Sequence, residues 1–392
     1  MKIKMLNILI TLFFVLAIVA FPFTSHAVVN WTKNPGNPVV VRGISGFDAG
    51  GLHRPVVIND GGTYKMWYTG IDVAGNRSVG YTTSSNSNGT LWENSHSQVF
   101  TKGTSGSWDE DHVGYASIIK DGGTYKMWYS GTDDEGGINN WQIGYATSPD
   151  ETNWTRYQLT PPKLLKGGAG DWDGGGVALP CVIKDGDNSY KMWYLGWNST
   201  STGWGIGYAT SEDGITWIKY NNNSAPVLQL GLAGTWDDFR LASPTVIKDG
   251  GVYRMWYDGM QDASSPTRIG YAYSNDGISW IKYGGNPVLT EGTAPAFDEY
   301  GPFDAMVLKD GNTYRMYYAG SRDCSEQGGC IDEIGYAESY STLYADFDGD
   351  GKADILWYHT SGATDIWLMN GTAIASNVLV GSTPTDWQIV SN

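Results

Sequence analysis

The segment DGGTYKMWYTG begins at Asp60, and four further copies of it follow along the chain. They read DGGTYKMWYSG from Asp121, DGDNSYKMWYLG from Asp185, DGGVYRMWYDG from Asp249 and DGNTYRMYYAG from Asp310. The differences between these starting positions are 61, 64, 64 and 61 residues. An apolar run precedes each Asp-Gly turn, and a segment similar to IGYATS follows each aromatic stretch. Tight Asp-Gly turns between such segments are typical of β-hairpins, so each copy predicts consecutive antiparallel strands.

Each copy has room for four strands. In the first copy we expect residues 55–58 to form the first strand, YKMWY the second and VGYTTSS the third. The fourth strand is expected at the W-x-K-Y segments, as in residues 217–220 and 280–283. Repeated four-stranded units of this size are typical of β-propellers. The sequence therefore predicts an all-β fold, a five-bladed β-propeller of four-stranded blades over residues 28–342.

The N-terminus offers the strand that the last copy lacks. No W-x-K-Y segment follows IGYAESYS, which starts at Ile334. The segment NWTKNPGNPVV from Asn30 instead matches SWIKYGGNPVL from Ser279. We therefore expect the N-terminal strand to complete the fifth blade and to close the ring without a covalent link.

Residues 1–27 have the pattern of a secretory signal peptide. Lys2 and Lys4 precede an apolar run over residues 8–21, and Ser25-His26-Ala27 is a small-residue cleavage site. The run is shorter than the roughly 20 apolar residues of a membrane helix. We expect a mature protein that starts near Val28 and is secreted, to the extracellular space or the periplasm, without membrane insertion.

The charge of the chain limits the possible partners. The net charge is −16, and it becomes −18 when the two lysines of the signal segment are removed. Nucleic acids and anionic membranes are poor partners for so acidic a protein. The composition instead suits cations and neutral ligands such as an oligosaccharide or polysaccharide, and we expect a monomer without an organic cofactor.

The three cysteines do not form a disulfide framework. Cys324 and Cys330 lie six residues apart in one loop, where they could form a local disulfide in an oxidising compartment. Cys181 lies in an apolar segment, which indicates a buried free thiol.

Features that all copies share are most simply scaffold, whereas departures from the repeat are better candidates for a site. An aspartate preceded by Trp or Phe stands twelve residues before each Asp-Gly turn, at Asp48, Asp109, Asp173, Asp237 and Asp298. This pair is expected to be a structural corner. The stretch between it and the first strand differs in every copy, and we expect it to line one mouth of the ring.

Carboxylates, histidines and arginines gather in these unequal stretches and at the ends of the second strands. One protonated and one ionised carboxyl can cleave a glycosidic bond, Arg or His can orient hydroxyls, and Trp can pack on a sugar ring. The candidate catalytic residues are Glu110, Asp111, Asp238, Glu299 and Asp304. The candidate substrate-binding residues are His53, Arg54, His112, Trp197, Arg240, Arg322 and Asp323. The alternative for each is a polar loop residue that is simply solvated.

The repeat resembles a known enzyme superfamily over residues 28–341. Its elements NPVL, WD, P-x-V-I-x-D-G-G, Y-K-M-W-Y-x-G and IGYATS-x-D-G-x-x-W are similar to those of the five-bladed propeller superfamily of arabinanases, levansucrases and invertases. That superfamily includes glycoside hydrolase families 43, 32 and 130. The resemblance implies cleavage or phosphorolysis of glycosidic bonds by carboxylates on the inner strands of different blades.

The chain departs from the family 43 pattern at the positions of the catalytic acids. Arg54 precedes Pro55 where an aspartate is expected, and Ala116-Ser117 replaces a Pro-Asp pair. Ala178-Leu179-Pro180 stands in place of a Glu-Gly-Pro segment, and no Asn-Asp-Pro-Asn motif of invertases occurs. Any activity is therefore expected to use displaced groups such as the five acids named above.

The C-terminal residues 343–392 resemble a different family. The stretch ADFDGDGKADILWYHTSGATDIWLMNGTAIA from Ala345 is similar to a single FG-GAP (VCBS-type) repeat. We expect a small β calcium-loop repeat. Its loop predicts a Ca²⁺ site, because closely spaced carboxylates suit a hard cation. The expected ligands are Asp346, Asp348, Asp350 and Asp354, with Lys352 offering its backbone carbonyl. The alternative is an acidic turn that binds no metal.

Three hypotheses follow for the function. The first is a secreted carbohydrate-active protein, a glycoside hydrolase or phosphorylase acting in the propeller funnel. The second is a non-catalytic glycan-binding or cell-surface adhesion propeller, which the missing acids favour. The third is a scaffold for partner proteins.

Overall fold

The computed structural model describes residues 30–133, 140–157, 162–198, 200, 203–311, 313–325 and 329–340, together with four C-terminal strands. The signal segment 1–27 and the expected calcium loop 346–354 lie outside the described residues, so both remain predictions. The chain divides into the unit Val29–Thr342 and a second unit that contains the C-terminal strands. In the described parts of the chain, no helix is both long and apolar enough to cross a membrane.

The larger unit consists of antiparallel strands in five sets that follow the sequence repeats. Set one comprises β2 (Gly51–Asp60), β3 (Thr63–Ile71), β4 (Arg77–Thr83) and β5 (Ser97–Phe100), and set two comprises β6 (His112–Asp121), β7 (Thr124–Thr132), β8 (Gln142–Ser148) and β9 (Thr155–Arg156). Set three comprises β10 (Gly176–Lys184), β11 (Tyr190–Trp197), β12 (Gly205–Ser211), β13 (Ile218–Lys219) and β14 (Leu228–Gln229), and set four comprises β15 (Arg240–Asp249), β16 (Val252–Met260), β17 (Arg268–Ser274) and β18 (Ile281–Lys282). Set five comprises β19 (Pro302–Asp310), β20 (Thr313–Ser325), β21 (Gly329–Tyr340) and the N-terminal strand β1 (Thr32–Lys33). The short 3₁₀ helix η1 (Tyr220–Asn223) follows β13. The prediction of an all-β fold is confirmed.

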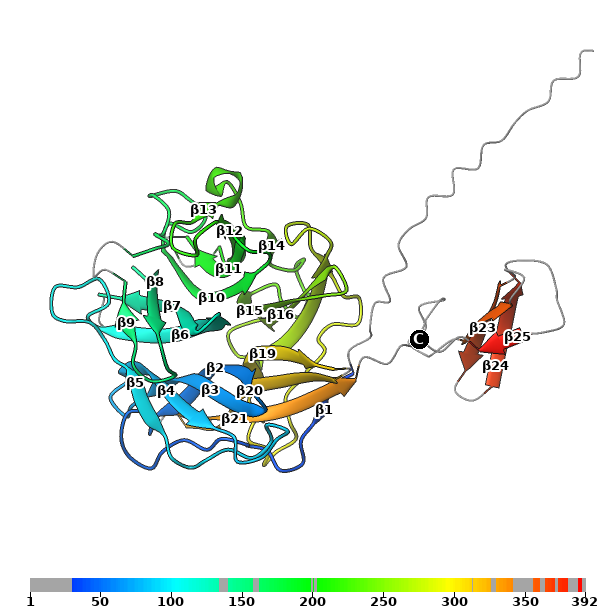
Figure 1. Ribbon diagram of the computed structural model, residues 1–392, viewed down its shortest axis with the longest axis horizontal. Helices are drawn as coiled ribbons and strands as arrows, with labels where there is room; N and C mark the ends of the chain where they lie inside the picture. The colour runs from blue at the N-terminus through cyan, green and yellow to red at the C-terminus, as the bar shows by residue number, and fades with distance from the viewer. Residues whose placement is uncertain are drawn as a thin grey trace, which may run out of the picture. The chain divides into compact units, whose positions relative to one another are not determined.

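The first strands of the sets form a ring. Each of β2, β6, β10, β15 and β19 contacts the next, and β19 contacts β2 again. Figure 1 shows the sets following one another around a common centre, with these first strands innermost. Sets five and one also join through a parallel pairing of Gly51 with Asp332.

The N-terminal strand completes the fifth set, as the sequence predicts. Thr32 and Lys33 of β1 pair with Glu338 and Ala337 of β21 in antiparallel register. Because the two ends of the larger unit share one sheet, this pairing fastens the ring.

Aromatic residues of the second strands fill the space between neighbouring sets. Trp67, Trp128, Trp193 and Trp256 are fully buried, and Tyr317 takes the same position in set five. The indole of Trp128 donates to the carbonyl oxygen of Gly214 in the next set at 2.7 Å. The aromatic repeat of the sequence thus supplies both the apolar core and polar links between sets.

The repeated Trp/Phe-Asp pair is scaffold, as the comparison of copies predicts. All five aspartates are nearly inaccessible to solvent. In set two, Asp109 accepts hydrogen bonds from Tyr129 at 3.0 Å and from Arg156 at 2.9 Å. The same tyrosine contact recurs in every set, and a Lys, Arg or His from the fourth-strand segment joins it.

Both cysteine predictions are confirmed. Cys324 and Cys330 form a disulfide between β20 and β21. Cys181 is a buried free cysteine, and its Sγ accepts a hydrogen bond from the backbone N–H of Val246 at 3.1 Å.

The smaller unit contains one antiparallel sheet. Its strands are β22 (Ile355–His359), β23 (Thr364–Asn370), β24 (Ala373–Leu379) and β25 (Trp387–Ile389), in the order β24-β23-β22-β25. This four-stranded sheet agrees with the prediction of a small β unit at the C-terminus.

Candidate functional site

Every first strand carries a bulge at the same position. The pairing of first and second strands shifts register there in all five sets. The bulged residues all have positive φ, and they are Arg54 (46°), Tyr115 (48°), Leu179 (53°), Ser243 (53°) and Asp304 (53°). Such backbone conformations are uncommon for residues other than glycine, and bulges often lie beside functional sites. The repeat therefore presents five equivalent positions to the ring centre, each with different chemistry.

The second strand of the preceding set holds some of these bulges. The hydroxyl of Thr69 accepts the N–H of Tyr115 at 2.6 Å, and Ser130 accepts the N–H of Leu179 at 2.9 Å. In set four the equivalent residue is Asp258, whose two carboxylate oxygens accept the N–H of Asp304 at 3.0 and 3.1 Å. Only this copy therefore places a carboxyl behind an acidic bulge residue.

A cavity of about 300 Å³, here called the mouth cavity, opens at the bulge end of the ring. Its polar lining includes His53, Tyr115, Ser243, Asp258, Asp304 and Asp332. His53 lies between two acids, with Nε2 at 2.8 Å from Asp332 Oδ2 and Nδ1 at 3.8 Å from Asp304 Oδ2. Ser243 donates its hydroxyl hydrogen to Asp304 Oδ1 at 2.6 Å.

Two acids of the mouth cavity have pKa values shifted in opposite directions. Burial, and then the nearby carboxylate of Asp304, raise the pKa of Asp258 to about 8. Burial also opposes ionisation of Asp332, but hydrogen bonds from His53 and Ser321 outweigh it and hold the pKa of Asp332 below its ordinary value. At neutral pH one acid therefore keeps a proton while the other is ionised, which is the arrangement that acid–base catalysis needs.

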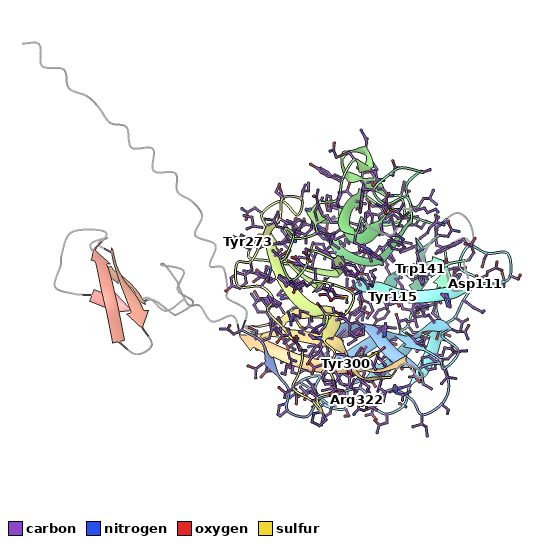
Figure 2. All side chains as sticks on the ribbon, turned by 180° about the vertical axis from the view of Figure 1, so that it is seen from behind. Asp111, Tyr115, Trp141, Tyr273, Tyr300 and Arg322 are labelled. Carbon is purple, nitrogen blue, oxygen red and sulfur yellow. A yellow bond between two sulfur atoms is a disulfide. The ribbon has the colours of Figure 1, made fainter. Side chains whose placement is uncertain are left out.

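Tyr115 is positioned to donate a hydrogen bond into the mouth cavity. Its hydroxyl oxygen accepts from Nε of Arg77 at 3.1 Å, so its own hydrogen is left for another acceptor. The guanidinium of Arg77 also lies 5.9 Å from the ring centres of both Tyr115 and Trp141. Burial raises the pKa of Tyr115, so the phenol stays protonated. Figure 2 shows Tyr115 and Trp141 nearer the middle of the ring than Asp111.

The rim of the mouth cavity offers aromatic surface. Tyr300 lines the cavity and is 50% exposed, and Phe303 lines it from β19. Arg240 also lines the cavity, and its guanidinium lies 5.2 Å from the ring centre of Trp204. An exposed aromatic face beside hydrogen-bonding groups suits a sugar ring.

The structure brings three of the twelve sequence-predicted site residues into the mouth cavity, namely His53, Arg240 and Asp304. Arg54 lies beside it at the ring centre, where its Nη2 donates to the carbonyl oxygens of Pro180 and Pro244. The remaining candidates line other parts of the surface or the core.

Most of these remaining candidates have structural contacts of their own. Glu110 and Asp238 accept the N–H groups of Gly106 and Gly234 in equivalent turns. Asp111 donates its N–H to the carbonyl oxygen of Thr132, and Glu299 accepts the N–H of Asp323 at 3.4 Å. Arg322 pairs with Glu333 at 3.1 Å. Trp197 is buried against Trp204, and His112 is stacked on Trp141.

Several residues of the mouth cavity are absent from the sequence-based candidates, and the titratable ones are Tyr115, Tyr300, Asp258 and Asp332. Comparison of the copies could have found Asp258, because the residue after Trp-Tyr or Tyr-Tyr reads Thr, Ser, Leu, Asp and Ala in the five second strands. Tyr115 could have been found in the same way. Asp332 has no such signal, since its place depends on the pairing of β21 with β2.

Proton transfer and hydrogen bonding are the chemistry that the side chains of the mouth cavity offer. Asp258, Asp304, Asp332, His53 and Tyr115 are the groups that can take part. Within the part of the chain that the structure describes, no group of three or more His, Cys, Asp or Glu side chains could hold a metal ion.

Sequence comparison finds relatives but no family. No protein-family model matches the chain. It is 30% identical over 207 residues to Uncharacterized protein Rv1502 of Mycobacterium tuberculosis strain ATCC 25618 / H37Rv, and equally to Uncharacterized protein MT1551 of strain CDC 1551 / Oshkosh. The match covers 50% of this chain and spans 65% of the length of each relative.

Solved structures show the fold. A complex of BT0996 with RGII matches with a TM-score of 0.64 and 20% identity, over 79% of this protein and 92% of that one. A glycosyl hydrolase from Bacteroides ovatus matches with a TM-score of 0.61 and 17% identity, over 79% and 93% of the two proteins. A structure from the GH130 family of mannoside phosphorylases, which contains glycoside hydrolases that target β-1,2 mannosidic linkages in Candida mannan, matches with a TM-score of 0.61 and 19% identity, over 80% and 94%. The chain thus shares the propeller fold of glycoside hydrolase-like proteins.

Proposed function

We propose that the protein is a secreted glycoside hydrolase or phosphorylase that acts on a glycosidic bond in the mouth cavity of a five-bladed β-propeller. The five sets are the blades, and the first strands β2, β6, β10, β15 and β19 surround the axis. The observation that carries the proposal is the opposite pKa shift of Asp258 and Asp332 within one cavity. The similarity in fold to glycoside hydrolases supports the substrate class.

Each acid then has its own role. Asp258, which keeps its proton at neutral pH, is the general acid that protonates the leaving oxygen. Asp332 is ionised and bound to His53, so this pair accepts a proton from the attacking water or orients phosphate. Asp304 lies between them and stabilises the positive charge that develops on the sugar in the transition state. Tyr115 and Arg240 hold hydroxyl groups of the substrate.

The experiment is a screen of the purified protein against aryl glycosides and natural glycans, with and without phosphate. Asp304→Asn should lower turnover about 10²- to 10⁴-fold, the range of a lost catalytic carboxyl. Its melting temperature should hardly change, because asparagine tolerates positive φ and its amide oxygen can still accept from Ser243. Turnover should also fall above about pH 8, as Asp258 loses its proton.

Asp111→Asn is the matched control, because Asp111 does not line the mouth cavity. It should leave turnover within about twofold, since surface substitutions are usually nearly neutral. Equal losses in Asp304→Asn and Asp111→Asn would contradict the assigned roles. The proposal would be overturned if the protein neither bound nor cleaved any compound of the panel.

A non-catalytic glycan-binding propeller is the second candidate. Arg54, Ser117 and Ala178 stand where the resemblance to family 43 implies acids, which favours a protein that binds without cleaving. Binding of glycans without turnover in the same screen would select this function. Tyr300→Ala should weaken glycan binding under either proposal, because it removes the exposed ring at the rim.

We also propose that the C-terminal unit binds Ca²⁺ through Asp346, Asp348, Asp350, Asp354 and the carbonyl of Lys352. Their spacing, with four carboxylates within nine residues, supports the site. Calorimetric titration of the full chain with Ca²⁺ should give one site that Asp348→Asn removes. Unchanged binding in that variant would contradict the assignment.

A further inference from the structure

The side chain of Arg54 crosses the centre of the ring. It starts at the bulge of β2, and its Nη2 donates to the carbonyl oxygens of Pro180 at 3.2 Å and Pro244 at 2.8 Å. Those prolines belong to β10 and β15, whereas the neighbours of β2 in the ring are β6 and β19. The guanidinium therefore lies near the axis of the ring. Its side chain comes from β2, and its hydrogen-bond acceptors belong to β10 and β15 on the opposite side.

The positive charge of Arg54 is buried without a counter-ion. The residue is 4% exposed, and among the described residues it takes part in no ion pair. Its Nη1 is buried and has no hydrogen-bond partner within the described residues. A buried cation without a partner is strongly unfavourable, because neither water nor an anion replaces its hydration shell. Nη1 also carries two hydrogens that need acceptors.

The titratable groups around Arg54 form no ion pair with it within the described residues. Asp258 is close enough for Arg54 to lower its pKa, yet burial and Asp304 keep that pKa at about 8, so Asp258 is largely neutral at pH 7. Burial raises the pKa of the Cys181 thiol, which also stays neutral despite the opposing effect of Arg54. Asp304 accepts from Ser243 and faces His53 in the mouth cavity.

A second cavity, here called the axial channel, lies next to Arg54. It has a volume of about 360 Å³ and is lined by Arg54 and by the first strands of all five sets. One equivalent position in each set contributes Val56, Ser117, Cys181, Thr245 and Met306. The oxygen of Ser117 accepts the N–H of Val182 at 2.9 Å, so its hydroxyl hydrogen can donate to another acceptor.

We propose that Arg54 binds a small monovalent anion, chloride or a similar halide, in the axial channel. Lys248 and Lys309 also line the channel, but they pair with Asp185 and Asp249. Arg54 is therefore the cation of this lining without an ion pair among the described residues, and it lies beside one or two hydroxyl donors and apolar walls. That set balances a single negative charge, but it lacks the several free donors and unpaired positive charges that a phosphate needs. The site is separate from the mouth cavity, so the inference does not depend on whether the protein cleaves sugars.

The test is the thermal unfolding of the full chain in sodium chloride, bromide or gluconate at equal ionic strength. Gluconate carries several hydroxyl groups that the apolar walls of the channel could not hydrogen-bond, so it serves as the reference. A ligand that binds only the folded state raises its stability in a saturable way, and chloride and bromide should therefore raise the melting temperature to a plateau. Arg54→Met should lose this rise, and Arg54→Lys should keep part of it.

Arg268→Met is the control, because Arg268 pairs with Glu291 away from the channel. It should show the same halide dependence as the wild type. If Arg54→Met does not fold, chloride NMR line broadening of the wild-type protein, reversed by bromide, replaces it as the readout. The same halide effect in Arg54→Met as in the wild type, or no effect beyond gluconate, would overturn the inference. A larger Arg54-dependent effect of phosphate than of chloride would overturn the assignment to a monovalent anion.

Discussion

The two ends of the five first strands differ in how closely the five copies agree: the contacts at the Asp-Gly turn are repeated, whereas the residues at the bulge are not. At the Asp-Gly turn, Asp60 accepts hydrogen bonds from Lys65 of its own set at 2.6 Å, and from Lys120 at 2.7 Å and Tyr125 at 2.6 Å of the next set. The same contacts recur around Asp121, Asp185 and Asp249 with only Lys-to-Arg changes. At the bulge end, by contrast, the equivalent residues are Arg, Tyr, Leu, Ser and Asp.

This contrast teaches where the repeat can vary. The turn end joins each set to the next, so a change there weakens the ring. The bulge end has a backbone that the neighbouring set holds at least in part through side chains of the second strand, as Thr69 holds Tyr115. Its side chains are therefore free to differ, and the only bulged carboxylate, Asp304, lies in the mouth cavity.

The largest effect that would test this contrast is expected at the buried corner of set two. Asp109→Ala leaves Tyr129 and Arg156 without their shared acceptor. We expect a loss of about 3–5 kcal/mol in the free energy of unfolding, the cost of breaking a buried charged contact. Urea unfolding measures it, with Asp111→Ala as the control at about 0.5 kcal/mol or less. A loss below about 1 kcal/mol for Asp109→Ala would mean that the corner is not part of the scaffold.

The next prediction concerns pH, to which the two ends should respond in opposite ways. The lysine and tyrosine contacts lower the pKa of Asp60, so its contribution to stability is present above the unfolded pKa near 3.8 and is lost as the pH falls below it. Burial raises the pKa of Asp258 from 3.8 to about 8, so between these values the unfolded chain ionises while the folded one keeps the proton. The free energy of unfolding should therefore fall with rising pH across that window.

Asp258→Asn isolates this second effect. The variant cannot ionise, so its stability relative to the wild type should rise steadily from pH 4 to pH 8. Urea unfolding of both proteins at several pH values measures the difference. A difference that does not change with pH would show that Asp258 ionises normally.

The fold could be predicted from the sequence because repetition marks the scaffold directly. The Asp-Gly turns, the Trp/Phe-Asp corners and the segment NWTKNPGNPVV each pointed to a contact that the structure contains. Such contacts are local or recur in every copy, so comparing the copies within one chain is enough to find them.

The site could be predicted only in part. The unequal stretches led to His53, Asp304 and Arg240, but they also led to Glu110 and Asp238. Both of these acids end the same G-x-W-D-(D/E) turn and accept its glycine N–H, which the likeness of the two segments already indicated. Asp332 could not be found, because its approach to His53 depends on the long strand β21 reaching β2.

The smallest expected change in stability lies at the junction of sets five and one. This junction differs from the other turn contacts because it lacks the repeated lysine. Asp310 accepts from Tyr64 at 2.5 Å and from Arg315 at 3.3 Å, but Asn59 stands where the other sets have a lysine. Asn59→Lys should add the missing contact to a partly exposed carboxylate. Exposed ion pairs stabilise weakly, so the melting temperature should rise by only about 1–2 °C in differential scanning calorimetry.

Asn59→Gln is the control for this last change, since it lengthens the side chain without adding a charge. The lysine effect should disappear in high salt, because exposed charges are screened. A rise that persists in high salt, or one that the glutamine variant shares, would mean that the gain is not electrostatic. The turn contacts would then hold the ring by packing and by the tyrosine hydrogen bonds, and the lysines repeated in the other four sets would be there chiefly to cover their tyrosine rings, as Lys309 does over Tyr314.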